Sequence, residues 1–135
     1  MSEPTFDLVA THHVLTMHLG VAGTLFGGML LAWVDEAAAL YANKAADNRF
    51  VTFELEKVRF LLPCIVGDIV EVGARPLKAS RSGLQLELRV ARLGKDDAKE
   101  TVLSTRAVMV AVDGEGKKMP VAFKAGWAAR FAPVE

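Results

Sequence analysis

The chain has 135 residues, of which 52% are hydrophobic, with 16 basic and 16 acidic residues and a formal net charge of zero. This length fits a single domain spanning residues 1–135, whose core needs no disulfide or metal. The balanced charge provides no electrostatic footprint for nucleic acid or for a membrane surface, so we expect neither as a partner. The hydrophobic content is high for a small monomer and indicates apolar surface buried between subunits.

The start of the chain and its single cysteine bear on the cellular compartment in which we expect the protein. Residues 1–7 lack the basic start and the apolar run of a signal peptide. Cys64 is the only cysteine, so the chain cannot form an internal disulfide and fits a reducing compartment. We therefore expect a cytoplasmic protein.

The first half of the chain predicts one strand, one loop and one long helix. Residues 6–17 contain enough Val, Thr and Leu for a strand, and residues 19–26, with two glycines, form a loop. Residues 27–46 are rich in Ala, Leu and Met and contain no proline, which predicts a helix. This helix is apolar on nearly every side, so we expect it to be covered on most sides. Its uninterrupted apolar runs are too short to cross a bilayer.

The second half predicts strands. Apolar side chains change face between residues 51–55 and 58–62, which indicates one strand with a bulge near residues 56–57. Residues 69–79 form the next strand, where Pro76 marks an edge or a bulge. Residues 82–90 alternate strictly between apolar and other residues, and residues 101–112 form a last long strand. In the tail, a short helix is favoured around residues 125–131.

These elements predict an α+β fold, in which one long helix packs on an antiparallel sheet of about five strands. Such a sheet leaves edges and one face uncovered. We therefore expect the sheet to pair with a second subunit, which covers these surfaces.

The start of the predicted helix is the most informative segment. The first amides of a helix lack partners and carry partial positive charge. Gly27 and Gly28 stand at this start and let a ligand approach the backbone closely. Such amides can polarise a carbonyl and stabilise the oxyanion that forms when the carbonyl is attacked.

Asp35 lies inside the apolar helix and is interpreted as a buried acid. A buried carboxylate needs a partner, so a structural role and a catalytic role are about equally compatible with the pattern. Glu36 is its rival. Adjacent helix positions point about 100° apart, so only one of the two acids can face a given pocket.

The spacing of these groups has a geometric consequence. Asp35 follows Gly27 by eight residues, which is about 12 Å along a helix axis. One helix cannot bring both groups to the same carbonyl. Two antiparallel helices related by a two-fold axis could do so, with the amides from one subunit and the acid from the other. If Asp35 is catalytic, we expect the site to lie across a dimer interface.

Several segments together resemble the hot-dog acyl-CoA thioesterases of the acyl-CoA hydrolase family. Residues 23–28 have the sequence Gly-Thr-Leu-Phe-Gly-Gly, and residues 33–37 have Trp-Val-Asp-Glu-Ala. Residues 60–68 match the pattern Phe-x-x-Pro-x-x-x-Gly-Asp, and residues 110–120 resemble the family's usual ending. The resemblance covers residues 15–121 in order and leaves the tail from 122 to 135 outside it.

The resemblance implies a long central helix wrapped by a curved antiparallel sheet. It also implies a homo-oligomer with a dimer as the minimal unit, often a tetramer or hexamer. The implied reaction hydrolyses acyl-CoA to a free acid and CoA. Asp35 would activate water or attack the thioester itself, while the amide of Gly27, with that of Gly28, polarises the carbonyl. No metal or cofactor is implied, since CoA is part of the substrate.

Substrate contacts are implied at two further places. The residues at the position of the family's CoA-contacting hairpin would hold the CoA phosphates by charge-assisted hydrogen bonds; they are Lys78, Ser80, Arg81 and Ser82. An ordinary solvated hairpin is the alternative. Phe26 and Trp33 would line an acyl tunnel, or else pack in the core or the dimer interface.

One position departs from the family pattern. Many members carry an Asn shortly before the Gly-x-x-Phe-Gly-Gly run, and the matching position here is Gly20. An amide that positions water or binds the carbonyl is therefore missing, which keeps a non-catalytic acyl-CoA-binding protein open as an alternative. A hot-dog hydratase or dehydratase is the other alternative. Such enzymes pair a His with an acid, and the sequence places no His convincingly near the Asp35 helix.

Overall fold

The computed structural model describes residues 3–133. One long helix, α1 (Gly27–Ala45), accompanies a six-stranded sheet. The strands are β1 (Asp7–His13), β2 (Arg49–Phe60), β3 (Ile69–Ala79), β4 (Gly83–Leu93), β5 (Lys99–Val112) and β6 (Ala132–Pro133). The described residues also contain three 3-10 turns: η1 (Thr16–His18), η2 (Lys95–Asp97) and η3 (Ala128–Arg130).

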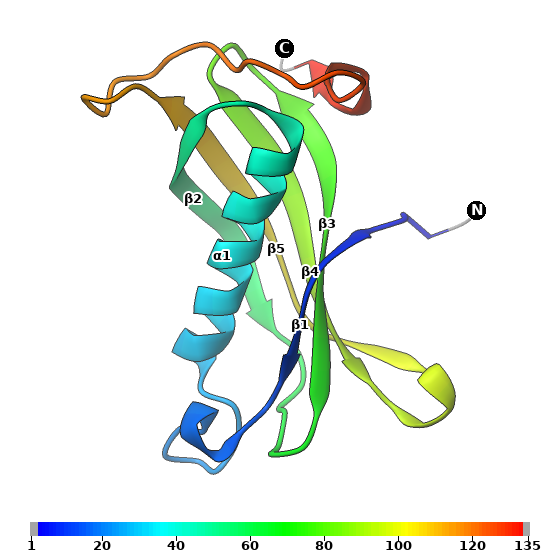
Figure 1. Ribbon diagram of the computed structural model, residues 1–135. Coiled ribbons are helices and arrows are strands. Elements are labelled where there is room, and N and C mark those ends of the chain that lie inside the picture. Colours follow the sequence, from blue (N-terminus) through cyan, green and yellow to red (C-terminus); the bar gives the residue numbers. More distant parts are fainter. Residues whose placement is uncertain (1–2, 134–135) are drawn as a thin grey trace.

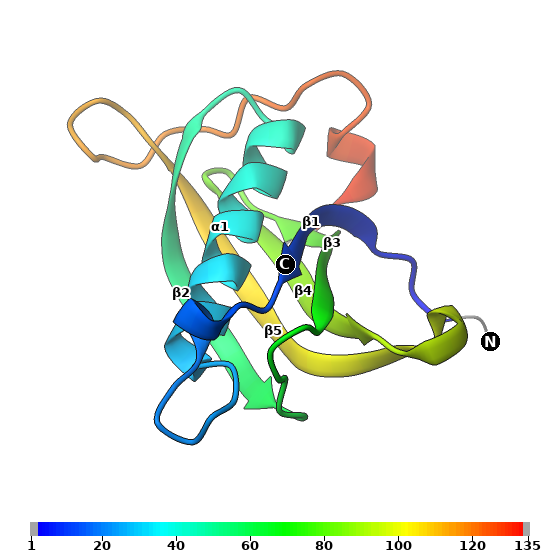
Figure 2. The ribbon, with the colours of Figure 1, turned by 60° about the horizontal axis from the view of Figure 1, so that its bottom comes forward.

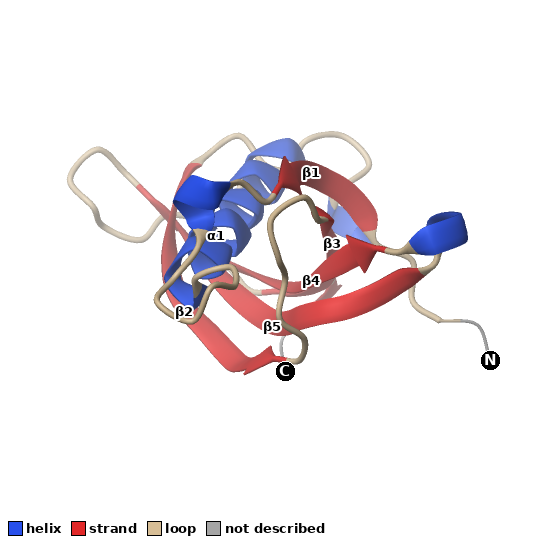
Figure 3. Ribbon diagram, turned by 90° about the horizontal axis from the view of Figure 1, so that it is seen from below, coloured by secondary structure: helices blue, strands red, loops and turns tan. Residues whose placement is uncertain are grey.

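The sheet wraps around the helix. Its strand order is β1-β3-β4-β5-β2, with antiparallel pairing throughout, and the short β6 adds a parallel pair to β3. Figure 1 shows α1 lying along the concave face, and Figure 2 shows the sheet curving around it. Seen from below, the strands form an arc about the helix axis (Figure 3). The predicted α+β fold, with one long helix wrapped by a curved antiparallel sheet, is confirmed.

Small residues let α1 approach the sheet closely. Val34, Ala37, Ala38 and Tyr41 are buried on the sheet-facing side of the helix. Opposite them, the alternating residues of β4 face inward, and Leu84, Leu86, Leu88 and Val90 are fully buried. The alternation that predicted this strand is therefore the pattern of the core. Among the described residues, no helix has the length and hydrophobicity that a membrane span requires.

The predicted bulges are confirmed. The pairing of β2 with β5 shifts register between Glu56 and Arg59, where Lys57 has a positive φ of 51°. The pairing of β3 with β4 shifts at Pro76. The pairing of β2 with β5 has a further register shift after Thr52, which was not predicted.

One face of α1 is left uncovered, contrary to the expectation that the helix would be covered on most sides. Ala32, Asp35, Glu36 and Leu40 are exposed along this face. The reason is that a single sheet packs on only one side of the helix. The neighbouring edge strand β2 also exposes apolar side chains, including Phe53 at 68%.

The tail closes the C-terminal end of α1. The Lys124 amide donates to the carbonyl of Ala45 at 2.9 Å, and its ammonium group donates to the carbonyl of Asn43 at 2.7 Å. Farther along, the predicted helix at residues 125–131 is only the short η3 turn. Arg130 in this turn forms an ion pair of 2.8 Å with Asp7 of β1.

Candidate active site

The first amides of α1 have no acceptor within the part of the chain that the structure describes. Phe26 precedes the helix in an extended conformation (φ −65°, ψ 130°) and provides no side-chain cap. Its carbonyl accepts the amides of Met29 and Leu30 at 3.0 and 3.1 Å. Neither the backbone nor a side chain within residues 3–133 accepts the amides of Gly27 and Gly28. These two N–H groups are therefore available to bind an oxygen atom of a ligand.

The glycines at this turn are favoured by space rather than by backbone angle, since neither has a positive φ. A Cβ added at Gly28 would lie 2.5 Å from Cε2 of Phe26. A Cβ added at Gly27 would lie 3.3 Å from Cε1 of Phe60. The aromatic rings thus pack directly against the bare helix start.

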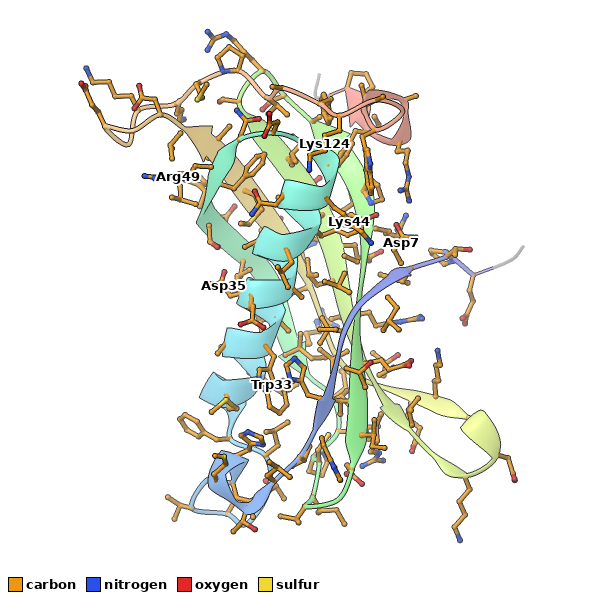
Figure 4. The ribbon with its side chains drawn as sticks, in the orientation of Figure 1. Asp7, Trp33, Asp35, Lys44, Arg49 and Lys124 are labelled. Atoms are coloured by element: carbon orange, nitrogen blue, oxygen red, sulfur yellow. The ribbon has the colours of Figure 1, made fainter. Side chains whose placement is uncertain are left out.

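Asp35 lies midway along α1 on the uncovered face and is exposed (Figure 4). The interpretation as a buried acid is therefore wrong for a single protomer, because no element covers this side of the helix. The hydroxyl of Thr52 in β2 donates to the Asp35 carboxylate at 2.5 Å. This contact fixes the carboxylate on the side of the helix nearest the edge strand. Glu36 is also exposed but has no such partner among the described residues.

The contact between Thr52 and Asp35 was not predicted from the sequence. The residue stands 17 positions after Asp35 on another element, and only the packing of β2 beside α1 brings the two together. A polar residue amid the apolar set of a predicted strand was the only available signal.

Within one protomer the structure does not unite the acid and the free amides. Both belong to the same helix, in which Asp35 follows Gly27 by eight positions, so about 12 Å of rise separates them. A donor and a base must both lie within about 3 Å of a reacting group, or one water away. The two groups of one chain therefore cannot act on one carbonyl.

The β3–β4 connection brings the predicted CoA-binding residues together. Lys78 and Ser80 line a cavity of about 280 Å³ beside Gly83, Gln85 and Val108. The Ser80 hydroxyl accepts the Gly83 amide at 3.1 Å and closes the turn. Arg81 is exposed, and its carbonyl accepts the Val121 amide at 2.8 Å. The backbone of Ser82 is held in the same way, because its carbonyl accepts the Ala111 amide at 2.8 Å.

Trp33 points to the opposite side of α1 from the acid and packs in the core (Figure 4). The ring of His12 in β1 stacks on it at 4.2 Å, and His18 meets it edge-on at 5.0 Å. The prediction that no His lies near this helix is therefore wrong. Burial lowers the pKa of His12, an effect that Glu36 opposes and His18 reinforces. His12 contacts Trp33 rather than Asp35, so it does not form the His–acid pair of a hydratase with Asp35.

A second cavity, also of about 280 Å³, lies beside the start of α1. Its lining includes Gly27, Leu30, Phe60, Cys64 and Val102. Phe26 and Trp33, the residues expected to line an acyl tunnel, are not part of it. The role of Phe26 in substrate binding stays a prediction.

Comparison with known proteins decides the family. Residues 22–98 match the family model described as the thioesterase superfamily. The chain belongs to the thioesterase superfamily. The acyl-CoA thioester hydrolase YciA of Salmonella typhimurium is 30% identical over 124 residues, which covers 89% of this chain and 93% of that protein.

Solved structures agree with this membership. The hexameric thioesterase y2039 from Yersinia pestis superposes with a TM-score of 0.82 at 29% identity, covering 89% of this chain and 98% of that one. An acyl-CoA hydrolase from Staphylococcus aureus, in complex with butyryl-CoA and CoA, gives a TM-score of 0.79 at 27% identity and covers 93% of this chain and 73% of that one. The predicted resemblance of this chain to hot-dog thioesterases is therefore confirmed.

Proposed function

We propose that this protein hydrolyses acyl-CoA thioesters to a free carboxylic acid and CoA. The observation that carries the proposal is the position of Asp35, which is exposed on the open face of α1 and oriented by Thr52. The relatives named acyl-CoA thioester hydrolases support the choice of substrate. We expect the protein to work in the cytoplasm without a metal or cofactor.

The reaction needs a base and an oxyanion site. In one route the Asp35 carboxylate takes a proton from water, and the resulting hydroxide attacks the thioester carbonyl carbon. In the other route the carboxylate attacks that carbon itself, and loss of the CoA thiolate leaves an anhydride, which water then cleaves to the free acid and the carboxylate. In both routes the amide of Gly27, with that of Gly28, donates to the carbonyl oxygen as its charge develops. The C–S bond then breaks, and CoA leaves as a thiolate that takes up a proton.

The complete site requires two copies of the chain. The open face of α1 and the exposed apolar side chains of β2 are the surfaces that a second copy would cover. A two-fold axis there sets the two helices antiparallel, so that Gly27 of one protomer approaches Asp35 of its partner. The hexameric assembly of the Yersinia pestis structure supports an oligomer of this kind. We propose the dimer as its minimal unit.

The same arrangement accounts for CoA binding. The β3–β4 connection lies at the end of the molecule where α1 finishes (Figure 1). An antiparallel partner brings the start of its own helix toward this end. We therefore propose that Lys78 and Arg81 hold the CoA phosphates of a thioester bound at the partner's Gly27 amide, with Ser80 and Ser82 nearby.

Gly20 stands where many family members have Asn, and Phe26 limits the space beside it. The Gly20 amide donates to Thr24 at 2.8 Å, and a Cβ added at Gly20 would lie 3.2 Å from the ring of Phe26. A longer side chain would therefore crowd Phe26. In this chain, Thr52 supplies the polar contact that orients the acid.

Thiol release from acyl-CoAs tests the proposal. Wild-type protein should release one free thiol per acid formed. Replacing Asp35→Asn keeps the side-chain shape but removes the base, and should lower kcat by about 10²- to 10⁴-fold while CoA binding persists.

The matched control is Glu36→Gln, which makes the same chemical change at the adjacent exposed acid and should leave kcat near that of the wild type. Absence of thiol release from every acyl-CoA would favour the binding-only alternative. An unchanged rate in the Asp35 variant would refute the role of this residue.

A further inference from the structure

The cavity beside the start of α1 is partly open to solvent, and its lining carries no charged side chain. Leu30, Cys64 and Val102 contribute to its lining and are only 4%, 1% and 0% exposed. Phe60, which is 54% exposed, stands at the outer side next to Gly27. The space therefore runs from the free helix amides toward the core.

The backbone holds the walls of this cavity in place. The Leu25 amide donates to the Cys64 carbonyl at 2.8 Å, which ties the loop before α1 to the connection between β2 and β3. The Leu61 amide donates to the Val102 carbonyl at 2.7 Å and ties that connection to β5. A pocket bounded by such contacts is preformed, as ligand sites usually are.

We propose that this cavity binds the acyl chain of the substrate and that Leu30 and Val102 set the longest chain it accepts. The inference rests on the proposed function, because a thioester carbonyl held by the Gly27 amide would place its acyl chain at the mouth of the cavity. The uncharged lining suits a hydrocarbon and disfavours the phosphates of CoA. The acyl chain and the CoA moiety thus leave the reacting carbon in different directions.

The volume indicates the chain length. An apolar cavity of about 150 Å³ can hold benzene, with six carbons. By proportion, a volume of about 280 Å³ holds about ten or eleven carbons. Each methylene that enters an apolar site strengthens binding about fourfold. Affinity should therefore rise with chain length up to about ten carbons and then level off.

Non-hydrolysable S-alkyl-CoA thioethers of increasing length test the pocket by calorimetry. For wild-type protein, Kd should fall about fourfold per methylene and reach a plateau near ten carbons. Leu30→Ala removes three carbons and should extend the rise by about two or three methylenes, so that a twelve-carbon thioether binds about tenfold tighter than it binds to wild type. Leu30→Phe fills part of the cavity, so affinity should level off at a shorter chain length than in the wild type.

Leu88→Ala is the matched control, because it removes the same volume from a buried leucine that does not line the cavity. In this variant, Kd should level off at the same chain length as in the wild type. If Leu30→Ala does not fold, Val102→Ala enlarges the same cavity with a smaller loss of side chain and should shift the plateau in the same direction.

Hydrolysis assays on the same variants separate this inference from the proposed function. Length-dependent binding without any thiol release would refute the hydrolase and leave the pocket standing. Thiol release with a Kd plateau that neither Leu30→Phe nor an enlarging variant moves would refute the pocket and leave the hydrolase standing.

Discussion

The two ends of α1 are completed in different ways. At its C-terminal end, the backbone carbonyls of Asn43 and Ala45 accept hydrogen bonds from Lys124 of the tail. At its N-terminal end, the amides of Gly27 and Gly28 have no acceptor within residues 3–133. Both sets of groups need hydrogen-bond partners from outside the helix, which other protein groups, water or a ligand can supply. The chain supplies these partners itself at one end and leaves the other end open to solvent or a ligand.

The side chains repeat this contrast. Near the C-terminal end, the buried Tyr41 donates to Asp7, which also pairs with Arg130. Near the N-terminal end, Phe26, Phe60 and Ile65 expose apolar surface. Exposed apolar surface and unsatisfied amides are typical of a binding site, whereas a saturated polar cluster is typical of a stabilising contact. The comparison predicts that changes at one end alter activity and changes at the other alter stability.

Among changes that test the contrast between the two ends of α1, removal of the Gly27 amide should have the largest effect. Gly27 is the first helical residue, where proline is tolerated, and Phe26 already has the extended conformation that proline requires of its predecessor. Gly27→Pro should therefore fold but lose the N–H group. Loss of one oxyanion donor should lower kcat by about 10²- to 10³-fold, as measured by thiol release.

Gly27→Ala is its control, because it adds a Cβ against Phe60 but keeps the amide. An equal loss of kcat in the two variants would mean that crowding by the added side chain, and not the missing amide, accounts for the effect.

A smaller effect is expected at the β3–β4 connection. Arg81→Ala should raise KM for acyl-CoA about three- to tenfold with little change in kcat, because a charge-assisted hydrogen bond to phosphate contributes to binding. The difference should shrink as salt concentration rises. Lys95→Ala, an exposed cation at the β4–β5 connection, should have no effect on KM. A drop in kcat at unchanged KM would argue against a role in CoA binding.

The smallest effect on activity is expected at the closed end. Tyr41→Phe removes one hydrogen bond to a carboxylate and should lower the free energy of unfolding by about 1 to 2 kcal/mol, with kcat/KM unchanged. Chemical denaturation and thiol release measure the two quantities. A loss of activity as large as that of Gly27→Pro would break the contrast between the ends.

The stability difference should also depend on pH. The hydrogen bonds from Tyr41 and then Arg130 lower the pKa of Asp7. A carboxyl whose pKa is lower in the folded state stabilises the protein above its unfolded pKa, about 4, and loses this contribution as pH falls through its folded pKa. The difference between wild type and Tyr41→Phe should therefore be full at neutral pH and diminish below about pH 4.

Local patterns predicted the elements well, and contacts between distant residues account for what was missed. The composition of α1 and the alternation in β4 predicted both elements, because helices and strands leave their period in the sequence. The contact between Thr52 and Asp35 depends on how β2 packs beside α1, which no local period encodes. The pair of Asp7 and Arg130 spans 123 positions. The exposure of Asp35 was missed because an apolar helix does not reveal which of its faces a partner covers.

Mixed oligomers test most directly the claim that one site takes its acid and its amides from different protomers. Asp35→Asn and Gly27→Pro chains, each nearly inactive alone, are combined in equal amounts. Random pairing makes about half of the dimers mixed, and each mixed dimer then has one intact site. The account predicts recovery to about a quarter of wild-type activity. A mixture no more active than the separate variants would contradict it, because acid and amide would then act within one chain.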